Sequence, residues 1–415
     1  MGVVFNKSDL QNHLGRYNRT NIEVFVVIIF YILMSYRCYY YEGLIQYKTL
    51  MGIFALFLTC FMYLSSVNFW KNNYKIETLI LFFTCLSGFI SMFHEGVGRF
   101  TAYLPYLSFI AIFYILKKTP SISTIENILV VSAIIYLCCW LYQVSQMPHT
   151  VFVTSNSEFA GNDDRGFYRF YIETKEHLPF LIFYLLALFN RKRNPILLFL
   201  ALLVLIVVLL HVVRQMVFWA CMLAIIYLVV TNKKRIGFLV IIGSLALCVY
   251  IYYISKSEVF LQLSEITMGK QYGVNNADFT NVRIEAMAYF IQDGCSDFSS
   301  FLFGKGMPAT GTDLSHSLRS AMSKSYILED VGFVAIFWHF GIIVVVLYLI
   351  LLYNVIFRTI VDSRYLYLKY YLGYLTLSFV GSHALTSNLI FVVLSIYILK
   401  RKAVKSILIK RSNKC

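Results

Sequence analysis

The chain has 415 residues, of which 59% are hydrophobic and only 14% charged, and its formal net charge is +15. Its mean hydropathy is +0.69. A soluble domain of this size does not need so much apolar surface, whereas a bundle of transmembrane helices of about 20 residues each does. The composition therefore excludes an ordinary soluble enzyme and predicts an all-α polytopic membrane protein.

Apolar runs long enough for transmembrane helices recur along the whole chain. We expect twelve spans, at residues 22–41, 49–69, 76–95, 99–116, 125–147, 177–190, 194–212, 215–232, 236–254, 333–357, 365–381 and 383–399. The sequence contains no internal repeat and no separate soluble domain, so residues 1–415 are expected to form a single membrane domain. Two longer polar segments, 148–176 and 255–331, interrupt the series of spans.

Basic residues set the expected orientation of the spans. If the N-terminus lies in the cytoplasm, the inner segments hold most of the Lys and Arg residues, including 191–193, 233–235 and the tail from Lys400 onward. Most acidic residues then lie on the opposite side, which is the distribution that the positive-inside effect produces. We therefore expect both termini in the cytoplasm and segments 148–176 and 255–331 on the outer side. This topology also accounts for the positive net charge better than nucleic-acid binding does.

Arg214 is the only formal charge in the 39 residues between the basic clusters 191–193 and 233–235. One straight helix of that length would measure roughly 58 Å, far more than a hydrocarbon core of about 30 Å. Two basic clusters on the same face instead require a hairpin with its apex near residue 213, so Arg214 is expected at or just below the outer surface. This arginine either snorkels to lipid phosphates or serves as an anion clamp that faces a substrate path.

Segment 279–292 in the larger outer insert predicts an amphipathic helix that carries Arg283 and ends at Asp293 and Gly294. Its apolar residues recur at helical spacing and are expected to dock on the membrane domain: Val282, Ala286, Tyr289 and Phe290. Arg283 neighbours this apolar stripe. Its guanidinium group therefore either points into the interface or pairs with an acid in solvent.

A turn-rich loop around Lys305 follows, and a second helix is expected to start at Asp313 or Ser315 and to carry His316 and Arg319. The Gly-Lys-Gly sequence of the loop resembles only a fragment of a phosphate loop, because it lacks the Walker spacing. His316 is the stronger candidate. A histidine at the start of an outer helix suits proton transfer at neutral pH, because its unperturbed pKa is about 6.5.

The smaller outer loop, 148–176, adds the basic residues Arg165 and Arg169. These two arginines either bind substrate over the same site or serve only as charges at the ends of the neighbouring spans.

Neither a metal ion nor an organic cofactor is expected. The acid pairs 163–164 and 329–330 are adjacent in the sequence, unlike the alternating acids that hold a metal on a sugar nucleotide. The histidines outside the insert, which include His177, His339 and His383, have no second ligand at metal spacing. They lie at span ends, in a short loop or inside an apolar run, and the sequence assigns them no chemistry.

Three of these residues form a recognisable set: Arg214 at the start of a central span, Arg283 on the first helix of the outer insert and His316 on its second helix. The sequence LFGKG precedes His316, and LEDVGFVAIFWHFGI at 328–342 leads into the next span. With these motifs the chain resembles the O-antigen and capsule polymerases (the Wzy family) and their relatives, the O-antigen ligases. The resemblance covers the whole architecture, and it implies a GT-C-like fold of about 12 transmembrane helices.

Two local details bear on this resemblance. The sequence of 330–332 and 340–342 is more similar to polymerases than to ligases, and ligases tend to have His-Asn where this chain has His316 and Ser317. Around Arg214 the chain departs from the family, which often has Ser-Arg-Gly where this sequence reads Val-Arg-Gln.

The resemblance implies a metal-independent, inverting glycosyltransferase that joins undecaprenyl diphosphate-linked oligosaccharides at the periplasmic face of a bacterial inner membrane. Arg214 and Arg283 would hold the diphosphate leaving group, because guanidinium groups bind phosphate bidentately and keep their charge. His316 would accept the proton of the acceptor hydroxyl or orient that hydroxyl. Lys305 and Arg319 would bind the acceptor's diphosphate or glycan. The implied partners are the lipid-linked donor and acceptor, membrane lipid and a chain-length regulator protein.

An O-antigen ligase and a lipid-linked oligosaccharide flippase are the alternative functions. Flippases and other secondary transporters also have about twelve spans, but they usually show related halves, charged residues in mid-span and short loops. This sequence shows a large outer insert and no related halves. The sequence therefore favours the polymerase, of either O-antigen or capsule.

Overall fold

The computed structural model describes residues 7–35, 46–66, 72–95, 100–146, 149, 151–152, 172, 174–211, 214–231, 281–308 and 312–412. Within these ranges the fold is all-helical and contains 15 α-helices. The helices before the outer insert are α1 (Lys7–Ser35), α2 (Lys48–Leu64), α3 (Lys75–Glu95), α4 (Ile110–Lys118), α5 (Ile122–Ser145), α6 (His177–Lys192), α7 (Pro195–Leu210) and α8 (Arg214–Thr231). Those in and after the insert are α11 (Asn281–Gly294), α12 (Phe298–Phe303), α13 (Asp313–Ser323), α14 (Phe333–Tyr353), α15 (Leu366–Phe379), α16 (Ala384–Ser387) and α17 (Leu389–Ser412).

Helices lie at every predicted apolar run inside the described ranges, and the run 236–254 falls outside them. Within the described part of the chain, three helical stretches are long and apolar enough to cross a membrane: Asn18–Ser35, Ile122–Ser145 and Phe333–Arg358. The run 99–116 deviates from a regular span. It starts as a 3-10 helix, η3 (Phe100–Phe109), which contains Pro105, a residue without an N–H group for the helical ladder.

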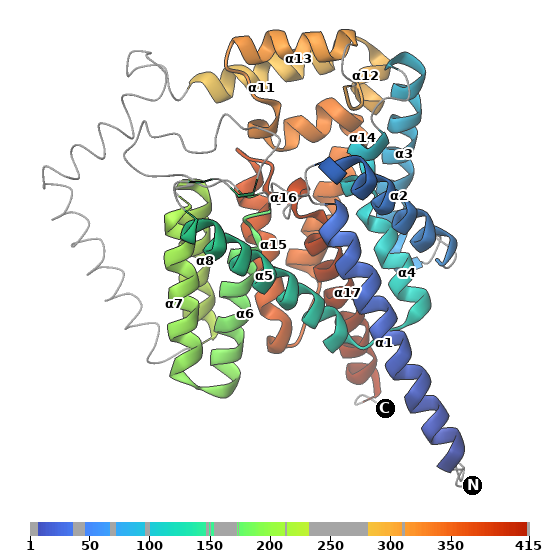
Figure 1. The fold of residues 1–415 in the computed structure, drawn as a ribbon, viewed down its shortest axis with the longest axis vertical. Coiled ribbons are helices and arrows are strands. Elements are labelled where there is room, and N and C mark those ends of the chain that lie inside the picture. The colour runs from blue at the N-terminus through green and yellow to red at the C-terminus, as the bar shows by residue number, and fades with distance from the viewer. Residues whose placement is uncertain are drawn as a thin grey trace, which may run out of the picture.

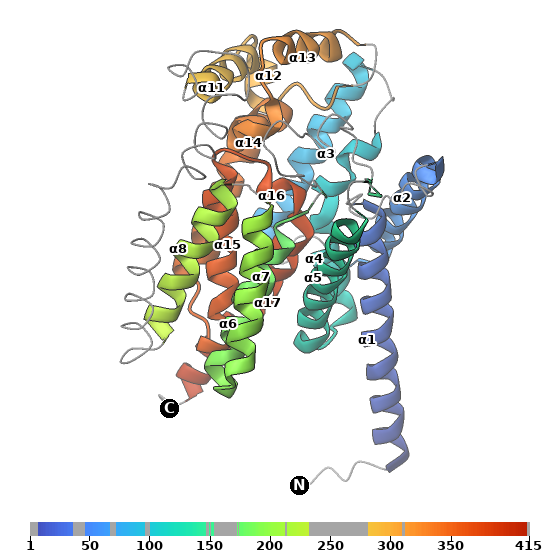
Figure 2. The same cartoon turned by 60° about the vertical axis from the view of Figure 1, so that its left-hand side comes forward.

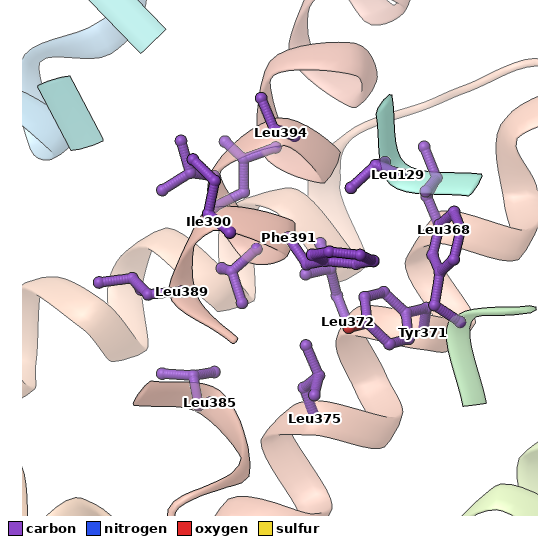
Figure 3. Packing of buried hydrophobic residues seen from close by; sticks show 14 of the residues in the cluster. Leu129, Leu368, Tyr371, Leu372, Leu375, Leu385, Leu389, Ile390, Phe391 and Leu394 are labelled. Carbon is purple, nitrogen blue, oxygen red and sulfur yellow. The ribbon is translucent and has the colours of Figure 1, made fainter. Parts of the chain in front are cut away.

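The core of the bundle lies where α15 and α17 pack against α5 and α6. In Figure 3, the ring of Phe391 from α17 lies beside Tyr371 of α15, with Leu129 of α5 nearby. The two rings meet at an angle of 66° with centroids 6.3 Å apart, which is a favourable edge-on aromatic contact. Nearly every side chain between Leu389 and Leu399 is buried, so α17 is central to the bundle.

Helices α11, α12 and α13 form a cap across one end of the bundle, above the start of α14 (Figure 1). Both ends of the described chain lie at the opposite end of the bundle (Figures 1 and 2). The expected docking face of α11 is confirmed, because Ala286 and Phe290 are buried. They pack in one cluster with Ala321 of α13 and Trp338 of α14. The helix expected to start at Asp313 or Ser315 starts at Asp313, and the Thr312 hydroxyl caps it.

A break in α14 connects this cap to the bundle. Gly341 has φ 79° and ψ 175°, so the helix is interrupted there. An interruption removes helical partners from the preceding carbonyl groups. The loop after α12 replaces those partners, because Lys305 N–H donates to Trp338 O at 2.8 Å and Gly306 N–H donates to His339 O at 3.0 Å. The Ser87 hydroxyl of α3 also donates to His339 O, at 2.9 Å.

Glycine is required on both sides of this contact. Gly304 and Gly341 both have positive φ values, 76° and 79°. A Cβ atom added at Gly304 would lie 2.3 Å from the carbonyl carbon of His339, and one added at Gly341 would lie 2.1 Å from Leu302 O. No side chain fits between two backbones at those distances. We call residues 304–306 and the broken segment 338–341 together the glycine clasp.

The glycine clasp predicts a difference between two kinds of glycine substitution. Gly304→Ala and Gly341→Ala combine a backbone clash with an unfavourable φ, so each should destabilise the protein by at least about 2 kcal/mol. The measurement is thermal unfolding of the purified protein in detergent. Gly373→Ala is the matched control, because its Cβ would meet nothing closer than Leu223 at 4.0 Å in a regular helix. If Gly341→Ala unfolded at the same temperature as Gly373→Ala, the clasp would not be a structural requirement.

Candidate functional site

The predicted hairpin break falls between α7 and α8. Helix α7 ends at Leu210 and α8 begins at Arg214, which agrees with an apex near residue 213. The side chain of Arg214 lies outside the described residues. The adjoining ends of α7 and α8 face the cap helices rather than the end of the bundle that carries the chain termini (Figure 2). Arg214 therefore begins a helix at the capped end of the bundle.

Two polar side chains converge on Gly381, in the turn between α15 and α16. A Cβ atom added at Gly381 would lie 3.2 Å from Oε1 and 3.3 Å from Nε2 of Gln215. The same atom would lie 3.6 Å from Nη1 of Arg283. The first turn of α8, which holds Arg214 and Gln215, and the arginine of α11 therefore meet over a residue without a side chain.

The Arg283 residue is exposed, and no described residue forms an ion pair with its guanidinium group. The sequence left open whether Arg283 points into the interface or pairs with an acid. The described contacts contain no such acid pair. The guanidinium group directs its fork of N–H donors toward the junction at Gly381. Such a group binds phosphate or carboxylate oxygens.

A cavity of about 50 Å³ adjoins this junction between η3, α14 and the α15–α16 turn. This volume holds a hydroxyl group or a few water molecules rather than a whole sugar ring. Phe379 and His383, which lie two residues before and after Gly381, both line it. The other lining residues are Tyr106, Leu328, Gly332, Ala335, Ile336, His339 and Thr386.

His339 is held in this cavity by the glycine clasp. Its ring nitrogen Nδ1 lies 2.8 Å from Gly306 O. A carbonyl oxygen can only accept, so Nδ1 carries the hydrogen, and in the neutral ring Nε2 keeps its lone pair. Sequence reasoning missed this residue, because His339 lies inside an apolar run. The signal in the sequence that could have indicated this site is the set of glycines at 304, 306 and 341, because glycine permits two backbones to approach each other closely.

Asp293 at the end of α11 ties the cap to the clasp. Its Oδ1 lies 2.7 Å from the ammonium group of Lys305, and its Oδ2 accepts a hydrogen bond of 2.8 Å from Trp338 Nε1. Both members of the ion pair are largely shielded from solvent, with side chains 18% and 23% exposed. Lys305 therefore has a structural partner, while its predicted contact with the acceptor stays a prediction.

The structure does not bring His316 to the arginine junction among its described contacts. Leu314 and Ala321 form the buried side of α13, whereas His316 and Arg319 are exposed. No described contact joins His316 to Arg283. Their predicted roles stay predictions, and the two remaining candidates of the smaller loop, at 165 and 169, lie outside the described residues.

A buried acid holds the short helix α16 beside the cavity. Glu176 is 2% exposed, and its Oε2 accepts a hydrogen bond of 2.7 Å from Asn388 Nδ2. Burial raises the pKa of the Glu176 carboxyl above its ordinary value, and the positive charge of Lys175 offsets part of that effect. The contact links the start of α6 to the start of α17. This contact thereby fixes the turn around α16, whose residues His383 and Thr386 form part of the cavity wall.

Comparison with known proteins gives no independent assignment. No protein-family model and no curated protein sequence matches the chain. Within the described residues, no group of three or more His, Cys, Asp or Glu side chains is placed to hold a metal ion. The site is therefore interpreted from its own geometry, which combines the exposed Arg283 with a small, mostly apolar cavity that His339, His383 and Thr386 line.

The meeting of α8 and α11 at Gly381 predicts a cross-link. In a variant without native cysteines, Gln215→Cys combined with Arg283→Cys should react with a short bifunctional thiol reagent, because both side chains reach the same Cβ position. The measurement is the mass of the cross-linked peptides. Gln215→Cys combined with Lys369→Cys is the control, since Lys369 lies at the other end of α15, about 18 Å from residue 381 along the helix axis. Equal yields from the two pairs would contradict the convergence.

Proposed function

We propose that the protein is a membrane glycosyltransferase of the O-antigen or capsule polymerase type. It joins undecaprenyl diphosphate-linked oligosaccharide repeat units at the outer face of a bacterial inner membrane. The observation that carries the proposal is the approach of Arg283 and Gln215 at Gly381. This approach brings a cation of the outer insert to the first turn of the helix that begins with Arg214.

The junction has the charge that a diphosphate requires. Transfer of the sugar breaks the bond between its anomeric carbon and the diphosphate oxygen, so negative charge develops on the leaving group. Arg214 and Arg283 stabilise that charge, because guanidinium forks bind phosphate oxygens bidentately and remain protonated. The N-terminus of α8 adds a favourable helix dipole at the same point.

The surface of the bundle suits a lipid-linked substrate. Large apolar side chains cover the outer faces of α7 and α8, including Phe199, Ile206 and Phe218 at 50–60% exposure. Such surfaces mark contact with lipid in a protein of this composition. A polyprenyl tail then stays in the bilayer beside these helices while its diphosphate reaches the junction at their end. The twelve-span topology with cytoplasmic termini belongs to the same proposal.

Arg283 provides a direct test of the proposed clamp. Arg283→Ala should lower the rate of chain elongation by about 100-fold or more, as the loss of one charge-stabilising group does in other enzymes. Arg283→Lys keeps the charge but loses the fork, so it should recover only a small part of that loss. The measurement is the length distribution of the glycan made by a strain that expresses the variant at the wild-type level.

Arg358→Lys is the matched control for this test, because Arg358 packs over Tyr353 at the end of α14 remote from the cap. It should leave the glycan length unchanged. Full-length chains from Arg283→Ala would rule out the clamp.

The same strains separate the proposed polymerase from the two alternatives. A lipopolysaccharide-producing strain that lacks its polymerase still attaches a single repeat unit to the lipid A core. A strain that lacks a ligase or a flippase attaches none. We expect the single repeat unit on deletion of this protein, and its absence would favour a ligase or a flippase.

A further inference from the structure

The geometry points to the cavity between η3, α14 and α16 as the pocket for the acceptor hydroxyl group, with Nε2 of His339 as the atom that takes its proton. This inference rests on the proposed function and deepens it, because it assigns a second subsite and a catalytic residue to which the sequence analysis assigned no chemistry. Three observations carry it: the hydrogen bonds of the His339 ring, the size of the cavity and the position of the cavity beside the arginine junction.

The first observation is the fixed orientation of the imidazole. Nδ1 donates to Gly306 O at 2.8 Å, so the neutral ring presents Nε2 as an acceptor. The backbone of His339 is also held, because its carbonyl oxygen accepts from Gly306 N–H at 3.0 Å and from the Ser87 hydroxyl at 2.9 Å. A base whose ring and backbone are both fixed loses little freedom when it engages a substrate.

The second observation is the size and lining of the cavity. About 50 Å³ admits one hydroxyl group with its carbon, but not a complete sugar. Tyr106, His383 and Thr386 add polar side chains to walls that are otherwise formed by apolar residues and glycine. A small recess with a few polar side chains in mostly apolar walls suits the reacting hydroxyl of an acceptor whose remaining rings lie outside.

The third observation is the position of the cavity next to the cationic junction. Phe379 and His383 line the cavity, and Gly381 between them is the residue at which Arg283 and Gln215 meet. A donor diphosphate bound at Gly381 would therefore contact the turn whose flanking residues line the hydroxyl pocket. The turn at 379–383 thus lies between the cationic junction and the cavity that His339 lines from α14.

The reaction step follows from this arrangement. The acceptor oxygen forms a bond to the anomeric carbon of the donor as the bond from that carbon to the diphosphate oxygen breaks. The bonding electron pair leaves with the diphosphate, which Arg214 and Arg283 stabilise. The hydroxyl proton moves to Nε2 of His339 and gives an imidazolium ion, which later releases it to solvent. Direct attack inverts the configuration at the anomeric carbon.

His316 is the alternative base that the sequence favoured. Its side chain lies on the exposed side of α13, opposite the buried Leu314 and Ala321. His339 instead lines a cavity whose wall includes Phe379 and His383, the residues on either side of the turn at Gly381. Assigning the base to His339 or to His316 therefore predicts opposite effects of substituting each histidine on the rate of elongation.

The experiment uses the full-length protein in lipid nanodiscs with a synthetic undecaprenyl diphosphate-linked repeat unit as donor and acceptor. His339→Asn is the informative variant, because the asparagine amide N–H can take the place of Nδ1–H toward Gly306 O while Nε2 is lost. We expect kcat to fall by about 100- to 10,000-fold, the usual contribution of a general base, with donor affinity and melting temperature unchanged. His149→Asn, at an exposed position, is the matched control and should keep the wild-type rate.

Ala335→Leu provides a second test if His339→Asn does not fold. It fills the cavity from α14 without altering His339, and it should also lower kcat while the donor still binds. The inference is overturned if either folded variant elongates at the wild-type rate, if His339→Asn loses donor affinity in parallel with turnover, or if His316→Asn alone abolishes elongation. A wild-type protein that binds the donor but never elongates it would instead overturn the proposed function, and the inference with it.

Discussion

The contact between the broken helix α14 and a glycine loop determines how the cap of α11, α12 and α13 is joined to the bundle. Helix α14 is interrupted at Gly341, and the loop at 304–306 supplies hydrogen bonds to the carbonyl groups of Trp338 and His339. An interrupted helix needs such partners, because unpaired buried backbone groups are costly. Asp293 strengthens the same contact through Lys305 and the Trp338 indole. The outer insert is thus attached to the bundle by its backbone and by a shielded ion pair.

The consequence of this attachment is a site with two chemically different halves. On one side, α11 is held so that Arg283 reaches Gly381 and meets the first turn of α8. On the other side, the clasp turns the ring of His339 into a small cavity. A cationic, solvent-exposed half suits an anionic leaving group, and a recessed half with a neutral imidazole suits a hydroxyl nucleophile. The proposed reaction needs both halves at once, and the clasp is the element that they share.

Much of this fold follows from patterns that act over short distances. Hydrophobic runs coincide with helices in the described residues, although the run 99–116 begins as a 3-10 helix. The paired basic clusters at 191–193 and 233–235 predict the break before Arg214. The apolar stripe of α11 predicts its docking face. The cavity was not predictable in the same way, because it depends on a contact between residues 304–306 and 338–341 that no local period encodes. His339 lies in an apolar run, so its sequence context favours a buried, inert ring. His316 shows the converse, since its place at the start of an outer helix indicates chemistry but says nothing about which way the helix faces.

The most direct measurement is an electron cryomicroscopy structure of the protein in a nanodisc with bound undecaprenyl diphosphate. The account predicts density for the diphosphate between the guanidinium groups of Arg214 and Arg283, over Gly381, with α14 still broken at Gly341. A diphosphate bound elsewhere on the protein, or a continuous α14 with the 304–306 loop detached, would contradict it.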